Sequence, residues 1–289
     1  MAPVSTSRAR RAAQAVLHRV QKRIGAEVAD SELDVDAWVI APHPDDEVLG
    51  CGGTIACKVA QGARVRVCFL TDGSSSHQRW IPKVELRALR EGEALSACER
   101  LGVSRDDVVF LGFEDGSLAQ HVDDAAAALR RLFKEWPGVE VYAPHHREQP
   151  EDHRAACWVA RTAMQGLRFP SVYLEYPVWC WNEWPWVELS GASGLRKAAR
   201  AGAGFHRSLR LMNECRWQVP LDDLRGQKWH ALEAHASQMR GLAEVEDSPT
   251  LVGFAGGEFL ARFFSSHEFF ARYESPPPIP RWPSDQKRP

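Results

Sequence analysis

Short apolar runs that alternate with helical patterns constrain the fold of this 289-residue chain most strongly. The pattern predicts strands near residues 36–41, 64–70, 108–111 and 139–143, and helices over residues 53–61, 82–101, 122–136 and 154–165. This order favours parallel strands that are joined by right-handed crossovers through helices. The sequence therefore predicts an α/β fold: a Rossmann-like, mostly parallel sheet flanked by helices, with a C-terminal elaboration. Such a fold specifies no chemistry by itself.

A polar cluster directly follows the first predicted strand. Residues 41–47 read APHPDDE, with an imidazole at His43 and two adjacent carboxylates at Asp45 and Asp46. Ligands gather at the carboxyl edge of open α/β sheets, and His and Asp are good ligands of a divalent metal. Adjacent residues of a regular strand point to opposite faces, so the two carboxylates share a site only if the chain turns here. The neighbouring proline and the glycines of residues 50–53 favour such a turn.

The glycines invite a second interpretation, a dinucleotide-binding loop. The G-x-G-x-x-G spacing fails because Ile55 stands at the last position, and the preceding carboxylates repel a pyrophosphate. Nicotinamide binding is therefore not favoured.

A second polar cluster offers the third protein ligand that catalytic zinc sites typically have. His153 follows the predicted strand at 139–143 and lies near the predicted start of the next helix. If the two strands are parallel neighbours, His153 faces the first cluster. The alternatives are structural, since Pro-Asp-Asp strings are common at turns and most single histidines are surface or core residues. The two clusters together, each at the end of a strand, favour metal binding.

These motifs resemble the LmbE-like, or PIG-L, family of zinc-dependent N-acetyl sugar deacetylases. Residues 41–47 carry the most specific match, and supporting matches follow at residues 71–73, 90–93, 101–103, 111–116, 152–154 and 234–238. The resemblance implies that zinc is held by His43, Asp46 and His153. It also implies that Asp45 is the general base for a zinc-bound water that removes an N-acetyl group from an amino sugar or glycoconjugate. Iron(II) or another divalent metal suits the same ligands.

The resemblance further implies that Arg90 and Asp115 contact the substrate. A helix-surface ion pair and a turn explain these two residues equally well without it. His146 is a third predicted substrate contact.

One position departs from the family pattern. Relatives usually read His-Pro-Asp-His at the segment of the third ligand, whereas this chain has Pro150 in place of the first histidine and His153 in place of the second. The first histidine stabilises the oxyanion or acts as the acid in the family. His145, His146 or Glu148 could replace it, or Asp45 could serve as both base and acid.

Four tryptophans fall within residues 179–186. A hairpin whose indoles pack into one face is the structural interpretation. The functional one is a wall of the substrate cleft, with Trp179 and Trp181 stacking on the apolar faces of a sugar.

We predict three parts: a basic N-terminal helix within residues 1–30, the deacetylase domain over residues 31–274, and a disordered proline-rich tail over residues 275–289. The basic helix either lies on a membrane or partner, or packs on the domain. Within the domain we predict a flexible segment at 189–204, a strand at 213–220, a helix at 224–242 and an aromatic helix at 259–273.

Composition narrows the function classes further. A net charge of −2 gives no long-range attraction to nucleic acid, and no apolar run approaches the ~18 residues of a membrane-spanning helix. Seven scattered cysteines predict buried free thiols and a cytoplasmic protein. The expected partner is a small N-acetylated sugar or glycoconjugate, and an oligomer is possible. The alternatives are an amidase for another sugar- or lipid-linked amide, and a non-catalytic sugar-binding member of the family.

Overall fold

The computed structural model describes residues 8–138, 140–169, 172–189, 193–242, 245 and 248–277. The helices are α1 (Arg8–Ile24), α2 (Asp30–Leu33), α3 (Asp46–Ala60), α4 (Lys83–Arg100), α5 (Val122–Glu135), α6 (Glu151–Met164), α7 (Gly194–Glu214), α8 (Arg225–Leu232), α9 (Ala236–Met239) and α10 (Glu258–Arg262). The strands are β1 (Ala26–Glu27), β2 (Ala37–Ala41), β3 (Val65–Thr71), β4 (Val108–Phe113), β5 (Glu140–Pro144), β6 (Val172–Tyr176), β7 (Trp217–Pro220) and β8 (His267–Tyr273).

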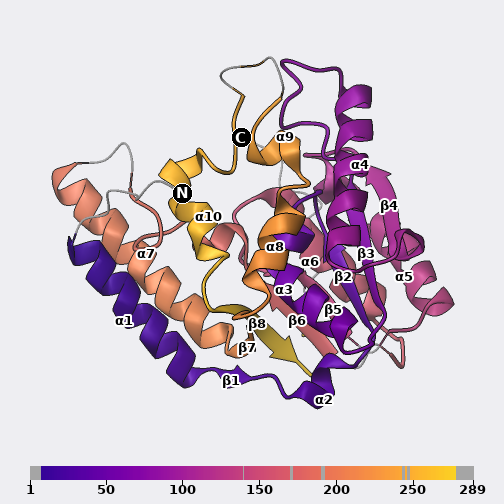
Figure 1. The fold of residues 1–289 in the computed structure, drawn as a ribbon, viewed down its shortest axis with the longest axis horizontal. Coiled ribbons are helices and arrows are strands. Elements are labelled where there is room, and N and C mark those ends of the chain that lie inside the picture. The colour runs from indigo at the N-terminus through magenta and orange to yellow at the C-terminus, as the bar shows by residue number, and fades with distance from the viewer. Residues whose placement is uncertain are drawn as a thin grey trace.

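The strands form one sheet in the order β1-β7-β8-β6-β5-β2-β3-β4, and among the described strands only β8 runs antiparallel to its neighbours. Helices α3, α4 and α8 lie in front of the sheet in Figure 1, and α5 and α6 lie behind it. Two apolar clusters pack on the sheet. One includes residues of α3, α4 and α8 and extends to α1 and α7. The other includes residues of α5 and α6. The prediction of a mostly parallel α/β sheet flanked by helices is confirmed.

The order of the strands places the site. From β2 the chain adds β3 and then β4 on one side, whereas β5 returns to the other side of β2. Ligands of open α/β sheets bind outside the carboxyl ends of the strands at such a switch point. The segments that follow β2 and β5 therefore come together at one edge, as the spacing of the two polar clusters predicts.

Helix α3 begins at Asp46, so the prediction that residues 50–53 form a turn before a helix at 53–61 is wrong. The glycines lie inside the helix because they allow close packing. A Cβ atom on Gly50 would lie 2.2 Å from Cδ2 of Tyr176, and one on Gly53 would lie 2.0 Å from Cδ2 of Leu221. Helix α6 also starts early, at Glu151, which puts His153 in its first turn.

We expect Gly50→Ala to destabilise the protein by about 1–3 kcal/mol, because the added methyl group overpacks a fully buried site against the Tyr176 ring. Gly92→Ala, in the exposed interior of α4 with nothing within 4 Å of its Cβ position, is the matched control. That control should gain up to about 1 kcal/mol from helix propensity. Urea denaturation of both variants measures the difference, and equal stabilities would contradict the packing role of Gly50.

The C-terminal part differs most from the sequence prediction. Helix α7 covers residues 194–204, which were predicted as part of a flexible segment, and residues 213–214, which were predicted as the start of a strand. The predicted helix at 224–242 is broken into α8 and α9. The aromatic segment predicted as a helix over 259–273 forms α10 and then the inserted strand β8. Strands that are buried on both faces read as continuous apolar runs, and such runs also suit a buried helix.

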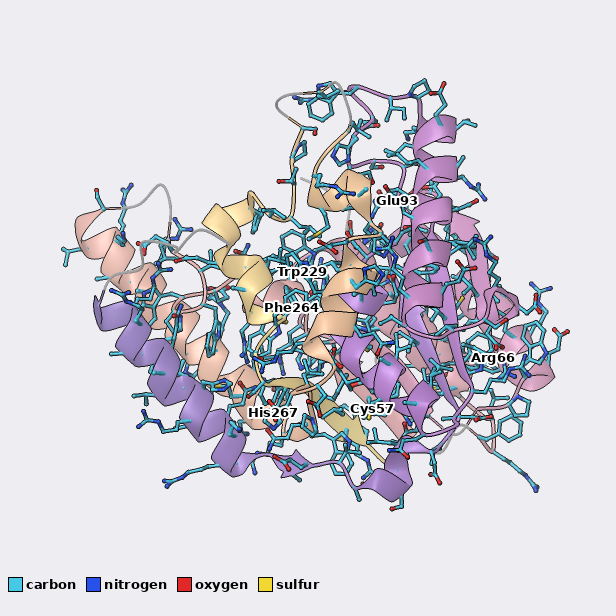
Figure 2. All side chains as sticks on the ribbon, in the orientation of Figure 1. Cys57, Arg66, Glu93, Trp229, Phe264 and His267 are labelled. Atoms are coloured by element: carbon cyan, nitrogen blue, oxygen red, sulfur yellow. The ribbon has the colours of Figure 1, made fainter. Side chains whose placement is uncertain are left out.

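The predicted tryptophan hairpin is wrong as well. Residues 179–181 form a 3₁₀ turn, η3 (Trp179–Trp181), and residues 182–189 continue as loop and turns. Aromatic contacts also join segments of the C-terminal part to one another. Trp229 of α8 meets Phe264 edge to face at 5.0 Å (Figure 2).

The basic helix α1 packs on the domain and lies beside α7 in Figure 1. Leu17 is 2% exposed, and the Arg10 guanidinium is buried against the Glu258 carboxylate.

No described helix is long and apolar enough to cross a membrane. Six of the seven cysteines, all except Cys57, are buried thiols outside any disulfide. The division into three parts stays a prediction, and most of the predicted tail, residues 278–289, lies outside the described residues.

Candidate metal centre

The structure brings His43, Asp46 and His153 together at the switch point. Oδ2 of Asp46 lies 3.2 Å from Nδ1 of His43 and 3.3 Å from Nε2 of His153. One ligand atom from each residue fits within a mutual distance of 4.8 Å. His43 follows β2, Asp46 opens α3 and His153 lies in the first turn of α6. Their role as metal ligands remains a prediction.

The surroundings of the two imidazoles fit a metal. Nε2 of His43 lies 3.2 Å from Oδ1 of Asp115 and 3.4 Å from Oδ2 of Asp152, while Nδ1 of His153 lies 3.4 Å from Oε2 of Glu148. Histidines that bind a metal usually direct the other ring nitrogen at a carboxylate, which fixes the ring and its tautomer. Two imidazole nitrogens and one carboxylate oxygen suit zinc or iron(II).

The charges of these groups are strongly coupled. Burial opposes protonation of His43, but the carboxylates of Asp115, Asp152 and Asp46 outweigh it and raise the pKa of His43 well above its usual value. Burial likewise opposes ionisation of Asp46, but His153 and His43 outweigh it and lower the pKa of Asp46. The site thus favours an ionised Asp46 and positive charge next to it, as a cation-binding site requires.

Asp45 has an unusual backbone. Its φ of 120° is one of two positive values among described residues other than glycine, and its N–H donates to Oε2 of Glu47 at 2.9 Å. Asp45 occupies the N-cap position of α3, yet its side chain makes no capping hydrogen bond. Backbone strain of this kind costs about 1–3 kcal/mol and is concentrated at functional sites. The Asp45 carboxylate therefore does not cap the helix, and the residue is only 8% exposed.

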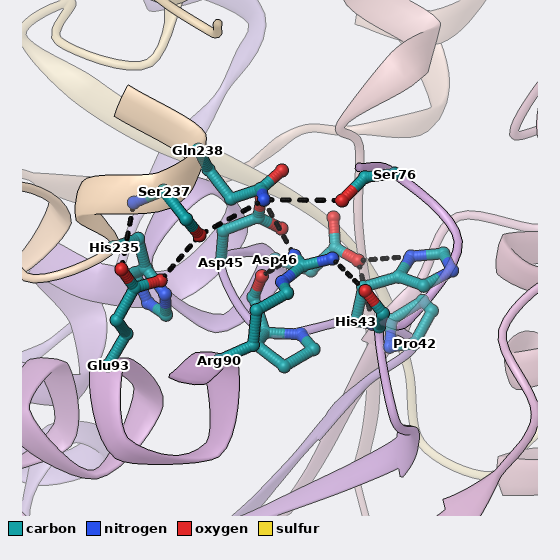
Figure 3. A network of polar contacts seen from close by, with 12 residues as sticks. Pro42, His43, Asp45, Asp46, Ser76, Arg90, Glu93, His235, Ser237 and Gln238 are labelled. Carbon is teal, nitrogen blue, oxygen red and sulfur yellow. Dashed lines mark hydrogen bonds and ion pairs between the residues drawn. The ribbon is translucent and has the colours of Figure 1, made fainter. Parts of the chain in front are cut away.

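Arg90 holds the loop around Asp45. Its guanidinium donates to the carbonyl oxygens of Gly73 and Pro44, and Nη2 lies 3.5 Å from Oδ2 of Asp45 (Figure 3). Burial raises the pKa of Asp45 to about 7, against the opposing effect of Arg90. General bases work best with a pKa near the operating pH.

Because the pKa of Asp45 is raised in the folded state, its ionised form lowers stability as pH rises from its unfolded pKa to about 7. We expect Asp45→Asn, after removal of metal, to be more stable than the wild type at pH 8 by about 4 kcal/mol, the free energy that corresponds to a rise of the pKa from 3.8 to about 7. The gain should shrink toward pH 4. Asn tolerates the same backbone, so the difference reports the charge. Urea denaturation at both pH values measures it, and a gain that is equal at the two values would contradict a raised pKa.

A network of buried polar groups is linked to Asp45 through Glu47, which accepts from the Asp45 N–H. Oε1 of Glu47 lies 2.7 Å from Nε2 of His235. The Glu93 carboxylate accepts from the backbone N–H and hydroxyl of Ser237 (Figure 3). His235 is fully buried within this network.

Glu47 and Asp152 carry no role predicted from the sequence, and Glu148 is predicted only as a substitute acid. Glu47 belongs to the first motif and Asp152 precedes His153, so their positions in the motifs were the available signal. The Asp152 carboxylate also accepts from the N–H groups of Gly116 and Leu118.

Arg90 and Asp115, two residues predicted to contact the substrate, make hydrogen bonds and ion pairs within the protein. Arg90 is 2% exposed and its donors serve the loop around Asp45. Asp115 contacts His43 and accepts from the Ser75 N–H, and its side chain is 13% exposed. Substrate contact by these residues stays a prediction, whereas their contacts with the motif are present in the structure.

Trp181 is 4% exposed and lies in the core, where the Arg262 guanidinium covers its ring at 4.0 Å from the centroid. This burial argues against its predicted contact with a substrate, which stays a prediction. Trp179 is only partly buried and stacks on Phe259 at 4.9 Å, so its predicted role stays open.

The side chains that could take the role of the family histidine at position 150 differ in their exposure to solvent. Pro150 is the N-cap of α6 and offers no proton. Glu148 is 2% exposed and accepts from three backbone N–H groups at residues 178–180, and His145 is fully buried. His146, with a side chain 25% exposed and Nδ1 2.8 Å from Oε2 of Glu175, is the accessible one.

Known proteins share this core. A family model described as "PIG-L: GlcNAc-PI de-N-acetylase" matches residues 38–164. The probable N-acetyl-alpha-D-glucosaminyl L-malate deacetylase 2 of Bacillus cereus is 31% identical over 124 residues, 40% of this chain and 55% of that protein. Diacetylchitobiose deacetylase of Thermococcus kodakarensis is 31% identical over 137 residues, 46% of this chain and 50% of that protein. The chain thus spans about half the length of these two relatives.

Solved structures extend the likeness to the fold of nearly the whole chain. The N,N'-diacetylchitobiose deacetylase of Pyrococcus horikoshii superposes with a TM-score of 0.62 at 19% identity, covering 95% of both chains. A conserved protein of Thermus thermophilus gives 0.54 at 24% identity, covering 86% of this chain and 98% of that one. At these identities the likeness shows the shared fold. The family match and the two relatives show that residues 38–164 form a PIG-L (LmbE-like) family domain.

Proposed function

We propose that the protein is a metal-dependent hydrolase that removes an N-acetyl group from an amino sugar or glycoconjugate. The observation that carries the proposal is the group of His43, Asp46 and His153 with the buried Asp45 carboxylate beside it. The family match and relatives that are named as deacetylases of N-acetylated sugars support it.

In this proposal His43, Asp46 and His153 hold the metal. A divalent ion bound there supplies Lewis acidity, which lowers the pKa of water and polarises an amide carbonyl. Zinc is the proposed metal, and iron(II) suits the same donors.

Asp45 is the proposed general base. Its carboxylate accepts a proton from the attacking water and returns it to the leaving nitrogen, so that acetate and a free amine form. Glu47 and Arg90 position this carboxylate through the Asp45 N–H and Oδ2. Because Pro150 cannot donate a proton, Asp45 is the proposed acid as well as the base, and His146 is the alternative acid.

Acetate release from a panel of N-acetylated sugars, by protein loaded with zinc or iron(II), tests this function. Acetate and a free amine in equal amounts support it. Release of a larger acid from sugar- or lipid-linked amides would indicate the amidase alternative. Binding of sugars without any product would indicate the non-catalytic alternative and contradict the proposal.

A further inference from the structure

Helix α1 has an outward face that the proposed chemistry does not use. The helix lies at the edge of the molecule in Figure 1, with α7 on its inner side. Arg10, Leu17 and Gln21 attach the other face of α1 to the domain, since their exposed fractions are only 2%, 2% and 0%. Residues 11, 12, 15, 16, 19, 20 and 22–24 of the same helix are exposed. Packing on the domain therefore leaves the outward face available for a partner.

The outward face carries positive charge that the protein does not neutralise. Helix α1 contains six arginines or lysines and no aspartate or glutamate. Arg10 pairs with the carboxylates of Glu188 and Glu258. Four exposed cations of α1 pair with no carboxylate in the part of the chain that the structure describes: Arg11, Arg19, Lys22 and Arg23.

The positive charge of α1 contrasts with the rest of the chain. The net charge of the whole chain is −2, so the segments outside α1 together carry an excess of acidic residues. An anionic surface therefore attracts α1 and repels the acidic remainder of the protein. This distribution of charge orients the molecule with the outward face of α1 toward such a surface.

Aliphatic side chains run along the same side of the helix. Val16, Val20 and Ile24 are 56%, 39% and 38% exposed. Because residues four apart lie above one another on a helix, these three form one aliphatic strip. Arg19 and Arg23 follow Val16 and Val20 by three positions, so they lie beside the strip. The surface thus combines exposed aliphatic groups with unpaired cations.

A bilayer that contains anionic lipids satisfies both kinds of group at once. Its head groups attract lysine and arginine, and the boundary between head groups and acyl chains accepts aliphatic side chains. Nucleic acid would neutralise the cations but leave the aliphatic strip in water, and α1 has no Phe, Tyr or Trp to stack on bases. A second copy of this face would bring like charges together, which is unfavourable.

We propose that the outward face of α1 binds the surface of an anionic lipid bilayer. The four exposed cations contact lipid phosphates, and the aliphatic strip enters the boundary between head groups and acyl chains. Arg10 and Leu17 continue to hold the helix on the domain, so the contact requires no change of fold. The inference does not depend on the proposed function.

Sedimentation of the full chain with lipid vesicles tests the inference. Vesicles of phosphatidylcholine are compared with vesicles of equal parts phosphatidylcholine and phosphatidylglycerol. The wild type should bind only the second kind, and more weakly as salt is added. Each cation near an anionic surface typically strengthens binding about fivefold, so the double substitution Arg19→Gln, Arg23→Gln should weaken it about 25-fold. The matched control, Arg131→Gln with Lys134→Gln on the exposed side of α5, should bind as the wild type.

A further substitution separates a bilayer from other polyanions. Val16→Ser should weaken binding to the anionic vesicles about 3- to 10-fold, because less apolar surface then enters the lipid. Val84→Ser is its control, since Val84 is 80% exposed on α4, outside the outward face of α1. Only a partner with an apolar layer distinguishes these two valines.

Weaker binding in both sets of α1 variants, with both controls unchanged, supports the inference whether or not the protein releases acetate. The inference is overturned if the wild type sediments with neither kind of vesicle, or equally with both. Equal losses in the α1 and α5 pairs would also contradict it. Binding that is lost in the α1 pair, unchanged in Val16→Ser and displaced by duplex DNA would identify a nucleic-acid surface instead.

Discussion

Asp45→Asn should lower the rate of deacetylation by about 10²–10⁴-fold, because general acid–base catalysis typically contributes that much. The amide has the shape of the carboxylate but accepts no proton from water. Asp45 lies outside the group of three that offers ligand atoms to a metal. The variant should therefore keep its metal content and lose kcat with little change in KM.

Asp222→Asn is the matched control, since the Asp222 side chain is 71% exposed and far from the proposed chemistry. It should behave as the wild type. Steady-state rates of acetate release, with metal content measured on the same samples, separate the two roles. Full activity in Asp45→Asn would remove Asp45 from the role of base, and loss of metal would make it a ligand instead.

His153→Ala should lose both metal and activity. Removing a partner that only orients a metal ligand typically costs about 10–100-fold in affinity, and removal of a ligand should cost more. Glu148→Gln tests the smaller effect, because Glu148 lies 3.4 Å from Nδ1 of His153 and donates no ligand atom to the proposed group. We expect metal affinity to fall in the order wild type, Glu148→Gln, His153→Ala.

His230→Ala is the control for His153→Ala, because the His230 side chain is 63% exposed on α8. Plasma mass spectrometry of protein that was purified without a histidine tag gives metal per chain. Competition with a chelator gives the relative affinities. Unchanged metal content in His153→Ala would contradict the three-ligand site.

The sequence predicts the N-terminal half of the fold well and the C-terminal part poorly. The early strands are short apolar runs separated by helices with a clear polar face. The hydrophobic pattern of each segment therefore predicts the element that the segment forms. Strand β8 enters between β6 and β7 after a long excursion of the chain, and Phe269 and Phe270 are buried on its two faces. No local periodicity distinguishes such a run from a buried helix.

The glycines of α3 show a second limit of sequence reasoning. Glycine usually marks turns, but Gly50 and Gly53 serve contacts with Tyr176 and Leu221, which are distant in the chain. The requirement for a small residue becomes visible only when those contacts are known.

The candidate site was predictable in its three principal residues, because the carboxyl ends of neighbouring parallel strands meet at one edge. Its supporting groups were not. The contact of Glu47 with His235 and that of Glu148 with the N–H groups at residues 178–180 depend on long-range packing. The burial of Trp181 beneath Arg262 depends on packing in the same way.

The most direct test of the account is acetate release from N-acetylglucosamine and its glycoconjugates by metal-free protein, titrated with zinc or iron(II). We predict that activity is absent without metal, rises in proportion to added metal and saturates at one ion per chain. Metal-free protein that releases acetate as fast as loaded protein would contradict the central claim.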